Sequence, residues 1–210
     1  VVILAPAIAI NMTWDAFLKT NKERYRVIRT SKDLEDVPEG IFLIVSSSML
    51  GKLKRSLARF IKFRSRKLCL VFDESDEITN PNSQRTKYVL CLFRRLKYKL
   101  LDTGTTTRNN ISELYSQFEL LYNNSVNMIC RCDRIYRENK EREIESESNP
   151  YYGEPFPAFR GHVLFKACHC PSKASVFGIE KQNQDVYNKD ELFSLIARTI
   201  ITRKFKDFAG

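Results

Sequence analysis

The sequence predicts an α/β fold in which a mostly parallel sheet lies between layers of helices, with a small loop-rich helical insertion. Three observations lead to this prediction. Short apolar runs alternate with helical patterns over the first two-thirds of the 210 residues, an order typical of βαβ units. The apolar runs are continuous, as in strands that are buried on both faces. After Asn123 the alternation stops, and charged and proline-rich stretches follow.

Five short runs are predicted to be strands because they are rich in β-branched or other apolar residues and end at polar residues. They are Val1 to Leu4, Tyr25 to Ile28, Ile41 to Val45, Leu68 to Phe72 and Tyr98 to Leu101. Because helical patterns separate them, we expect the strands to run parallel, with helices on both faces of the sheet.

Between and after these runs, apolar residues recur at helical spacing. The clearest case is the segment from Ser47 to Phe63, whose apolar positions are Leu50, Leu53, Leu57, Phe60 and Ile61. An earlier helix is predicted from Trp14, Phe17 and Leu18, with Thr13 as its N-cap. Further helices are expected over Ser31 to Val37, Ser83 to Leu96, Ile111 to Tyr122 and Asp190 to Arg203.

The chain is basic, with 35 Lys and Arg against 25 Asp and Glu and a formal net charge of +10. Such an excess favours a polyanionic partner, nucleic acid before an anionic membrane surface, and a basic protein without such a partner is the alternative. The apolar stretch from Val1 to Ile10 is too short to span a bilayer and is interrupted by Pro6, so no membrane partner is expected. The six scattered cysteines favour reduced thiols and an intracellular, cytoplasmic location, in the nucleoid or nucleus depending on the host.

The run from Leu68 to Phe72 ends abruptly in Asp73 and Glu74. In open α/β sheets, ligands bind at the carboxyl ends of the strands, so both carboxylates are placed where a ligand would lie. In nucleotide-hydrolysing enzymes the first carboxylate of such a pair holds Mg²⁺ and the second orients or activates a water molecule. A buried strand that leads into a solvated acidic turn is an alternative of equal weight.

Further motifs follow the acidic pair in a fixed order. Asp73-Glu74-Ser75-Asp76 is followed by Asn80 and Ser83, then by Thr103-Gly104-Thr105, Arg108-Asn109-Asn110 and Glu113-Leu114. As an ordered set, these motifs strongly resemble the Swi/Snf-like ATPases of helicase superfamily two. Segments that resemble the DNA-facing parts and the end of that family's first motor lobe are Val1 to Pro6, Ile44 to Leu50 and Thr199 to Lys204.

The resemblance implies roles for individual residues. Asp73 would hold Mg²⁺ through water, and Glu74 would polarise the attacking water. Coupling of the nucleotide site to the nucleic acid would involve Asp76, Thr103, Gly104 and Thr105, with Gly104 allowing close approach of the backbone. Contacts with the nucleic-acid backbone would come from Pro6, Ser46, Ser47, Ser48, Arg108 and Asn109. The alternatives are N-capping by the serines and an ordinary polar turn for residues 103–107.

The resemblance also implies an organisation and an activity. Residues 1–124 would form the core of the first RecA-like lobe, a three-layer unit trimmed at its N-terminus, residues 125–189 a loop-rich insertion, and residues 190–210 the closing helix of that lobe. The implied activity is that of an ATP-driven translocase or helicase acting on DNA, taken as double-stranded. ATP and Mg²⁺ would be the cofactors of a longer parent protein, and a second RecA-like lobe of that protein would be a partner.

The sequence departs from the family pattern at several points. Asp76 stands where His is usual, Asp102 precedes Thr103, and Thr106 stands where Pro is usual. The 210 residues contain no Gly-x-x-x-x-Gly-Lys-Ser/Thr loop. We therefore expect the chain by itself to bind nucleotide poorly and to hydrolyse little, since the loop lysine and the arginines of a second lobe contribute roughly 10³-fold or more.

Other patterns leave alternatives open. A basic run could contact phosphates, although a solvated helix face is favoured; its members are Lys52, Lys54, Arg55, Arg59, Lys62, Arg64, Arg66 and Lys67. Four cysteines could form a structural zinc site, namely Cys130, Cys132, Cys168 and Cys170. Inert thiols are favoured, because Cys-x-Cys is not the usual spacing of zinc ligands. Two rival functions are a basic nucleic-acid-binding module with no motor role and a metal-dependent nuclease that uses Asp73, Glu74 and Asp76 directly.

Overall fold

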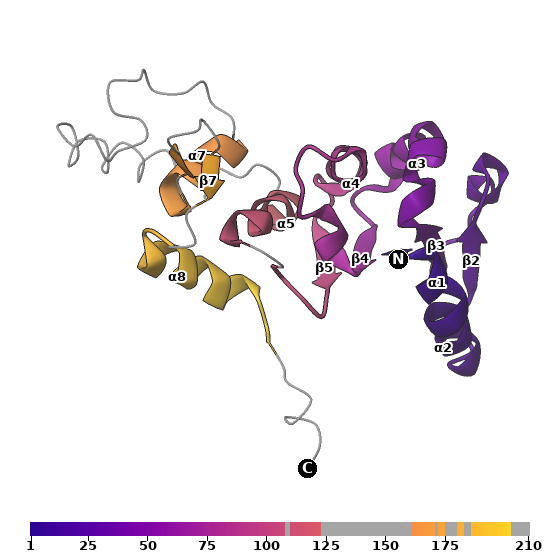
Figure 1. Cartoon of the computed structure of the whole chain (residues 1–210). Helices are drawn as coiled ribbons and strands as arrows, with labels where there is room; N and C mark the ends of the chain where they lie inside the picture. The colour runs from indigo at the N-terminus through magenta and orange to yellow at the C-terminus, as the bar shows by residue number, and fades with distance from the viewer. Residues whose placement is uncertain (108–109, 123–160, 171, 175–179, 183–185, 203–210) are drawn as a thin grey trace, which may run out of the picture. The chain divides into compact units, whose positions relative to one another are not determined.

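The computed structural model describes residues 1–107, 110–122, 161–170, 172–174, 180–182 and 186–202. The chain divides into two compact units, Val1–Met128 and Ile129–Gly210. Figure 1 shows the strands of the first unit and the helices packed against them. Each unit is described by itself.

The first unit is built on a five-stranded, all-parallel sheet with the strand order β2-β3-β1-β4-β5. The strands are β1 (Val2–Ala5), β2 (Tyr25–Ile28), β3 (Phe42–Ser46), β4 (Cys69–Asp73) and β5 (Tyr98–Asp102). Each matches its predicted run to within one residue, and the predicted parallel arrangement is confirmed. Since all strands run the same way, their carboxyl ends lie along one edge of the sheet.

Helices and turns connect the strands. After β1 come α1 (Ala7–Ala9), a π-helical turn η1 (Ile10–Trp14) and α2 (Asp15–Thr20). The 3₁₀ turns η2 (Ser31–Leu34), η3 (Ser47–Met49), η4 (Ser75–Ile78) and η5 (Ile111–Glu113) follow strands or precede helices. The longer helices of the first unit are α3 (Leu50–Arg64), α4 (Gln84–Phe93) and α5 (Leu114–Tyr122).

Helices cover both faces of the sheet, which gives three layers. Along β1, Val2 and Leu4 belong to the apolar cluster that includes α3 and α4, whereas Ile3 and Ala5 belong to the cluster that includes Ile10 and Leu18. This division follows from the two-residue period of a strand, which sends successive side chains to opposite faces. The predicted α/β fold, consistent with a RecA-like three-layer lobe, is therefore observed.

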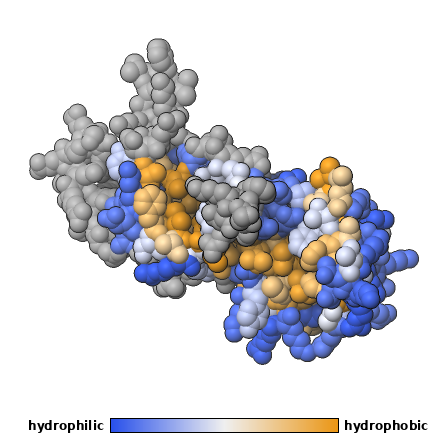
Figure 2. Space-filling model, turned by 90° about the horizontal axis from the view of Figure 1, so that it is seen from below, coloured by the Kyte–Doolittle hydropathy of each residue, from blue (hydrophilic) through white to orange (hydrophobic). Residues whose placement is uncertain are grey.

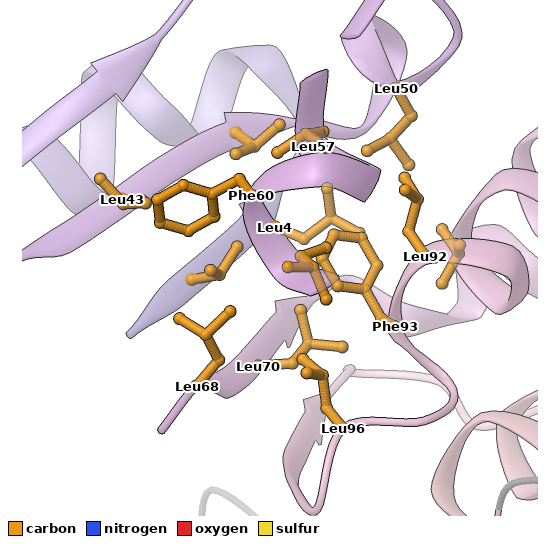
Figure 3. Close-up of a cluster of buried hydrophobic side chains, with 14 of the residues drawn as sticks. Leu4, Leu43, Leu50, Leu57, Phe60, Leu68, Leu70, Leu92, Phe93 and Leu96 are labelled. Carbon is orange, nitrogen blue, oxygen red and sulfur yellow. The ribbon is translucent and has the colours of Figure 1, made fainter. Parts of the chain in front are cut away.

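The larger apolar layer holds the sheet to α3 and α4. Figure 3 shows Phe60 of α3 beside Leu43 and Phe93 of α4 beside Leu4 and Leu70 in this cluster. The five apolar positions predicted for α3 are all buried. Because each fully buried side chain of this size contributes roughly 1.5–3 kcal/mol, this layer is a major source of the fold's stability.

The helix after β1 differs from its prediction. It begins at Ala7, directly after Pro6, and Thr13 lies inside the π-helical turn, so Thr13 is not an N-cap. Phe17 was expected on the buried face but is 56% exposed. The reason is the wide π turn, which shifts the residues after it relative to the α-helical spacing assumed from the sequence. The segment predicted as a helix over Ser31 to Val37 forms only the short turn η2.

The surface seen in Figure 2 is largely hydrophilic, with apolar patches between the charged residues. Tyr98 and Leu100 lie on the same face of the edge strand β5 and are 51% and 59% exposed, whereas the alternate residues Lys99 and Leu101 are half-buried. No described helix combines the length and the hydrophobicity that crossing a bilayer requires.

In the second unit the described elements are α7 (Gly161–His169), the antiparallel pair β6 (Ser172–Ala174) and β7 (Glu180–Gln182), and α8 (Lys189–Thr199). Most of the predicted insertion at 125–189 lies outside the described residues. The helix predicted from Asp190 is α8, which the chain's division places in the second unit. Closure of the first lobe by residues 190–210 stays a prediction.

Candidate functional site

The acidic pair and the threonine-glycine turn lie next to each other at the carboxyl edge of the sheet. β4 and β5 are neighbours, and their last residues, Asp73 and Asp102, are register partners. Glu74 and Thr103 follow these two residues, and each begins a turn. Because neighbouring strands are about 4.8 Å apart, the two turns start close together. The two turns are thus neighbours in the structure, although Asp73 and Thr103 are thirty positions apart in the sequence.

Glu74 occupies an unfavourable position. Its backbone is left-handed, with φ 55° and ψ 53°, at the start of η4, a conformation that costs a non-glycine residue on the order of 1 kcal/mol or more. The pKa of its carboxyl group is raised, first by loss of surrounding water and then by the negative charges of Asp76 and Asp73. The side chain is exposed and thus accessible to a ligand, which suits a group that takes up a proton.

Asp73 is half-buried at the end of β4. Its Oδ2 accepts a hydrogen bond of 2.8 Å from Nε1 of Trp14. A carboxylate oxygen at a strand end is a ligand that suits Mg²⁺, which usually takes one or two protein carboxylates and completes its shell with water and substrate phosphates. The residues present therefore fit an ion held through water by Asp73. Among the described residues, no three His, Cys, Asp or Glu side chains form a group that could hold a metal, so the direct three-carboxylate site of a nuclease is not seen there.

The two turns are connected by Gln117 of α5. Its Nε2 donates to the backbone oxygen of Thr106 at 2.8 Å, and its Oε1 accepts a bond of 3.4 Å from the hydroxyl of Ser75. Ser75 is fully buried, and Gln117 is 6% exposed. Asp76, predicted to couple the turns, is also buried, and its negative charge contributes to the raised pKa of Glu74. The described link between the turns therefore includes a residue that the sequence interpretation missed.

A signal for Gln117 is present in the sequence. It is one of the polar residues in a helix that is otherwise mostly apolar, and every residue of α5 from Leu114 to Leu120 is buried. A buried amide requires hydrogen-bond partners, and partners must then come from neighbouring elements. Trp14, by contrast, contributes to the sequence prediction only through the helical spacing after Thr13, and its bond to Asp73 spans 59 positions.

The threonine-glycine turn is held by its own hydrogen bonds. The hydroxyl of Thr103 accepts from the backbone N–H of Thr105 and donates to the backbone oxygen of Thr105, both at 3.1 Å. A Cβ atom placed on Gly104 would meet no heavy atom within 4 Å. The expected need for glycine as a point of close backbone approach is therefore not seen among the described residues.

The predicted nucleic-acid contacts near β3 are only partly accessible. Ser46 is the last residue of β3 and pairs with Ala5, which places it beside Pro6. Ser46 and Ser47 are buried, whereas Ser48 is exposed, and the hydroxyls of Ser46 and Ser48 are 2.8 Å apart. No side-chain cap is formed at the start of η3 or α3, so the N-capping alternative is wrong. Arg108 and Asn109 lie outside the described residues.

A strongly cationic helix follows these serines. The exposed residues of α3 include Lys52, Lys54, Arg55, Arg59, Lys62 and Arg64, and the helix has no acidic residue. Lys54 lies over the ring of Tyr88, with its Nζ atom 5.1 Å from the ring centre. The other face of α3 is the apolar face described above, so the positive charge is concentrated on the side that faces solvent.

The cysteine hypothesis is tested only in part. Cys168 and Cys170 are buried, and Nδ1 of His169 between them lies 3.1 Å from the backbone oxygen of Tyr187. Cys130 and Cys132 lie outside the described residues. A structural zinc site therefore has no support within the described part of the chain.

No protein-family model matches the chain, and no curated protein matches it significantly. The arguments for function therefore come from the arrangement of residues at the sheet edge and from the motif order in the sequence.

Proposed function

We propose that this chain is part of an ATP-dependent DNA translocase or helicase of the Swi/Snf-like kind, to which it contributes the acidic pair and the coupling turn of the first motor lobe. The observation that carries the proposal is the pairing of Asp73 with Asp102 at the carboxyl ends of adjacent parallel strands. This pairing places Asp73-Glu74 beside Thr103-Gly104-Thr105, in the arrangement that the motif order in the sequence requires.

The residues have distinct tasks under this proposal. Asp73 would hold Mg²⁺ through water, and the ion, when bound, neutralises charge on the transferring phosphate. Glu74 lies one residue further along and has a raised pKa, which suits a group that accepts a proton from water near neutral pH. Gln117 joins the backbone of Thr106 to the side chain of Ser75. A displacement of one turn would therefore alter the hydrogen bonding of the other.

The test is hydrolysis of ATP by the protein that the complete gene encodes, with and without double-stranded DNA. Asp73→Ala and Glu74→Gln should each reduce DNA-stimulated turnover by about 10²-fold or more, the range typical for loss of a proton-accepting group. Asp102→Asn is the matched control, because it removes one charge from the same sheet edge and should leave most of the activity. Unchanged turnover in both site variants would refute the catalytic assignment.

A second candidate function is binding of nucleic acid without a motor role. The observation that favours it is the solvent-facing side of α3, which is cationic along its whole length. The formal charge of +10 points to the same class of partner, because neutralised phosphates release counterions and so promote binding.

The 210-residue chain can be tested directly for this second function by measuring duplex DNA binding against salt concentration. Lys52→Ala with Arg55→Ala removes two positive charges from α3. Lys22→Ala with Lys32→Ala removes two exposed charges elsewhere. The slope of log K against log salt is negative, and each phosphate contact adds about 0.9 to its magnitude. If α3 contacts phosphates, the α3 double variant should reduce this magnitude by up to about 1.8, and the Lys22/Lys32 double variant should leave it unchanged. Equal slopes in the two double variants would exclude α3 as the binding surface.

A further inference from the structure

The indole of Trp14 is bonded to the carboxylate proposed to hold magnesium. Nε1 of Trp14 donates to Oδ2 of Asp73 at 2.8 Å, and no other described residue donates to that carboxylate. Trp14 is half-buried and packs against the apolar cluster on the α2 side of the sheet. The bond therefore joins the helical segment after β1 to the end of β4.

The position of Trp14 depends on an unusual helical turn. Trp14 is the last residue of the π-helical turn η1, between α1 and α2. Such turns are rare, and they occur frequently at functional sites. A regular α-helix over the same residues would turn the indole to a different direction. The π turn is thus a local cost that is accompanied by a specific contact at the site.

The helix segment that carries Trp14 is held by contacts of the residues that follow it. After it, Leu18 is 1% exposed and anchors α2 in the apolar layer. Asp15 accepts a hydrogen bond from the hydroxyl of Tyr25 in β2 and one of 2.6 Å from Nζ of Lys19. The edge of the Phe17 ring packs against the indole at a centroid distance of 6.3 Å. The indole therefore has little freedom to follow Asp73 if that carboxylate turns.

A neutral donor has a specific consequence for a carboxylate that binds a cation. The indole N–H only donates and carries no charge, in contrast to Arg, Lys or protonated His. It orients the carboxylate and occupies one oxygen without neutralising the negative charge that attracts a cation. A cationic partner at the same place would compete with Mg²⁺ for Asp73.

We propose that Trp14 is a positioning residue that holds Oδ2 of Asp73, so that Oδ1 is the oxygen that receives the water shell of the divalent cation. This inference rests on the proposed function for the cation, whereas the bond itself can be tested without it. Residues that orient a metal-binding side chain typically change metal affinity or activity by 10–100-fold when they are replaced.

The first experiment uses the fact that Trp14 is the one tryptophan in the 210 residues, so the indole N–H gives a single NMR resonance. In the intact chain, Asp73→Ala should shift this resonance and speed its exchange with solvent by about 10-fold or more, as expected for loss of a hydrogen bond to a charged group. Asp102→Ala, on the paired strand end, should leave it in place. An unmoved resonance in Asp73→Ala would overturn the proposal.

The second experiment adds Mn²⁺ to the same samples as a paramagnetic probe of the cation site. The indole resonance should broaden in the original chain and not in Asp73→Ala, because a cation held at Asp73 lies close to the indole. Equal broadening in the two proteins, or none in either, would overturn the assignment of Oδ1 to a cation while leaving the hydrogen bond established by the first experiment.

The third experiment separates positioning from mere packing, in the protein encoded by the complete gene. Trp14→Phe keeps an aromatic ring but removes the donor, and should raise the Mg²⁺ concentration for half-maximal ATP hydrolysis about 10-fold. Phe17→Leu keeps the indole donor and an apolar side chain beside it, and should leave that concentration unchanged. A Trp14→Phe protein with normal Mg²⁺ dependence would contradict the positioning role. Absence of any hydrolysis in the original protein would instead refute the proposed function, and the NMR result for the bond would stand.

Discussion

Two turns at the same edge of the sheet each present a carboxylate, and their chemistry is opposite. After β2, Asp33 accepts hydrogen bonds from the backbone N–H groups of Arg29 and Thr30 at 2.8 and 2.7 Å. These bonds lower the pKa of Asp33, with the bond from Arg29 as the largest cause. After β4, the pKa of Glu74 is raised, first by loss of surrounding water and then by its acidic neighbours Asp76 and Asp73.

The difference shows how a structural carboxylate can be told from a candidate functional one. Donors around Asp33 favour its charged form and complete a capping box with Thr30, so the charge contributes to folding. Glu74 lies near the negative charges of Asp76 and Asp73 and has a left-handed backbone. Its charge and its backbone conformation therefore both oppose folding. Perturbation of this kind, without benefit to stability, is a feature of functional sites.

The largest expected effect is that of Glu74→Gly. Glycine tolerates φ of 55° without strain, so the free energy of unfolding of the 210-residue chain should rise by about 0.5–1 kcal/mol. Under the proposed function, ATP hydrolysis by the protein encoded by the complete gene should fall by about 10²-fold or more, because the side chain proposed to accept a proton is gone. Urea unfolding and steady-state turnover measure the two quantities.

Asp36→Gly is the matched control for this prediction. Asp36 also has left-handed backbone, with φ 48°, but it lies after η2, away from the acidic pair in the chain. It should gain stability to a similar degree and keep normal turnover. If Glu74→Gly lost stability, the strain argument would be wrong, and if it kept full activity, Glu74 would not be part of the reaction.

The sequence predicted the strands better than the helix that carries Trp14. Short apolar runs bounded by polar residues located each of the five strands to within one residue, most simply for β1 and β3, where burial on both faces leaves little choice of residue type. The start of the helix after Pro6 was misplaced, since helical spacing assumes 3.6 residues per turn and the π turn at Ile10–Trp14 breaks that assumption.

The candidate site was predicted in its adjacent parts and missed in its distant ones. Asp73, Glu74 and Thr103 follow strands directly, so strand order alone brings them to one edge. The bond between Trp14 and Asp73 spans 59 positions, and the one between Ser75 and Gln117 spans 42. Such contacts depend on how helices pack on the sheet, and periodicity in one sequence carries no information about them.

The second prediction concerns Gln117, which stabilises the turn after β4 from a distant helix. Gln117→Leu removes both of its hydrogen bonds and leaves the fully buried hydroxyl of Ser75 without that partner. The free energy of unfolding should fall by about 1–3 kcal/mol, the typical cost of an unsatisfied buried polar group. Chemical denaturation of the 210-residue chain measures this loss.

The neighbouring residue Ser116 provides the control for Gln117. It is also fully buried, but its hydroxyl has no hydrogen-bond partner in the described structure. Ser116→Ala should therefore be neutral or slightly stabilising. Similar losses for the two substitutions would mean that α5 is merely sensitive to replacement, and that Gln117 has no special link to the two turns.

The smallest expected effect is that of replacing Asp33, the structural carboxylate of the comparison. Asp33→Asn weakens the bonds to the backbone of Arg29 and Thr30 and should cost about 0.5–1 kcal/mol at pH 7, as for loss of a partly exposed cap. Because the pKa of Asp33 is lowered in the folded state, its stabilisation is present above the ordinary value of 3.8 and is lost as the pH falls through the folded-state pKa.

The unfolding free energies of Asp33→Asn and the original chain should therefore converge as the pH is lowered below 3.8, the ordinary value for Asp33, and stay apart above it. Asp36→Asn removes an exposed carboxylate three positions away and should show no such convergence. Under the proposed function, ATP turnover should be the same in Asp33→Asn, Asp36→Asn and the original protein, because the capping box contributes only to folding. A constant difference at every pH would mean that Asn fails through lost packing, and that the charge of Asp33 does not stabilise this turn.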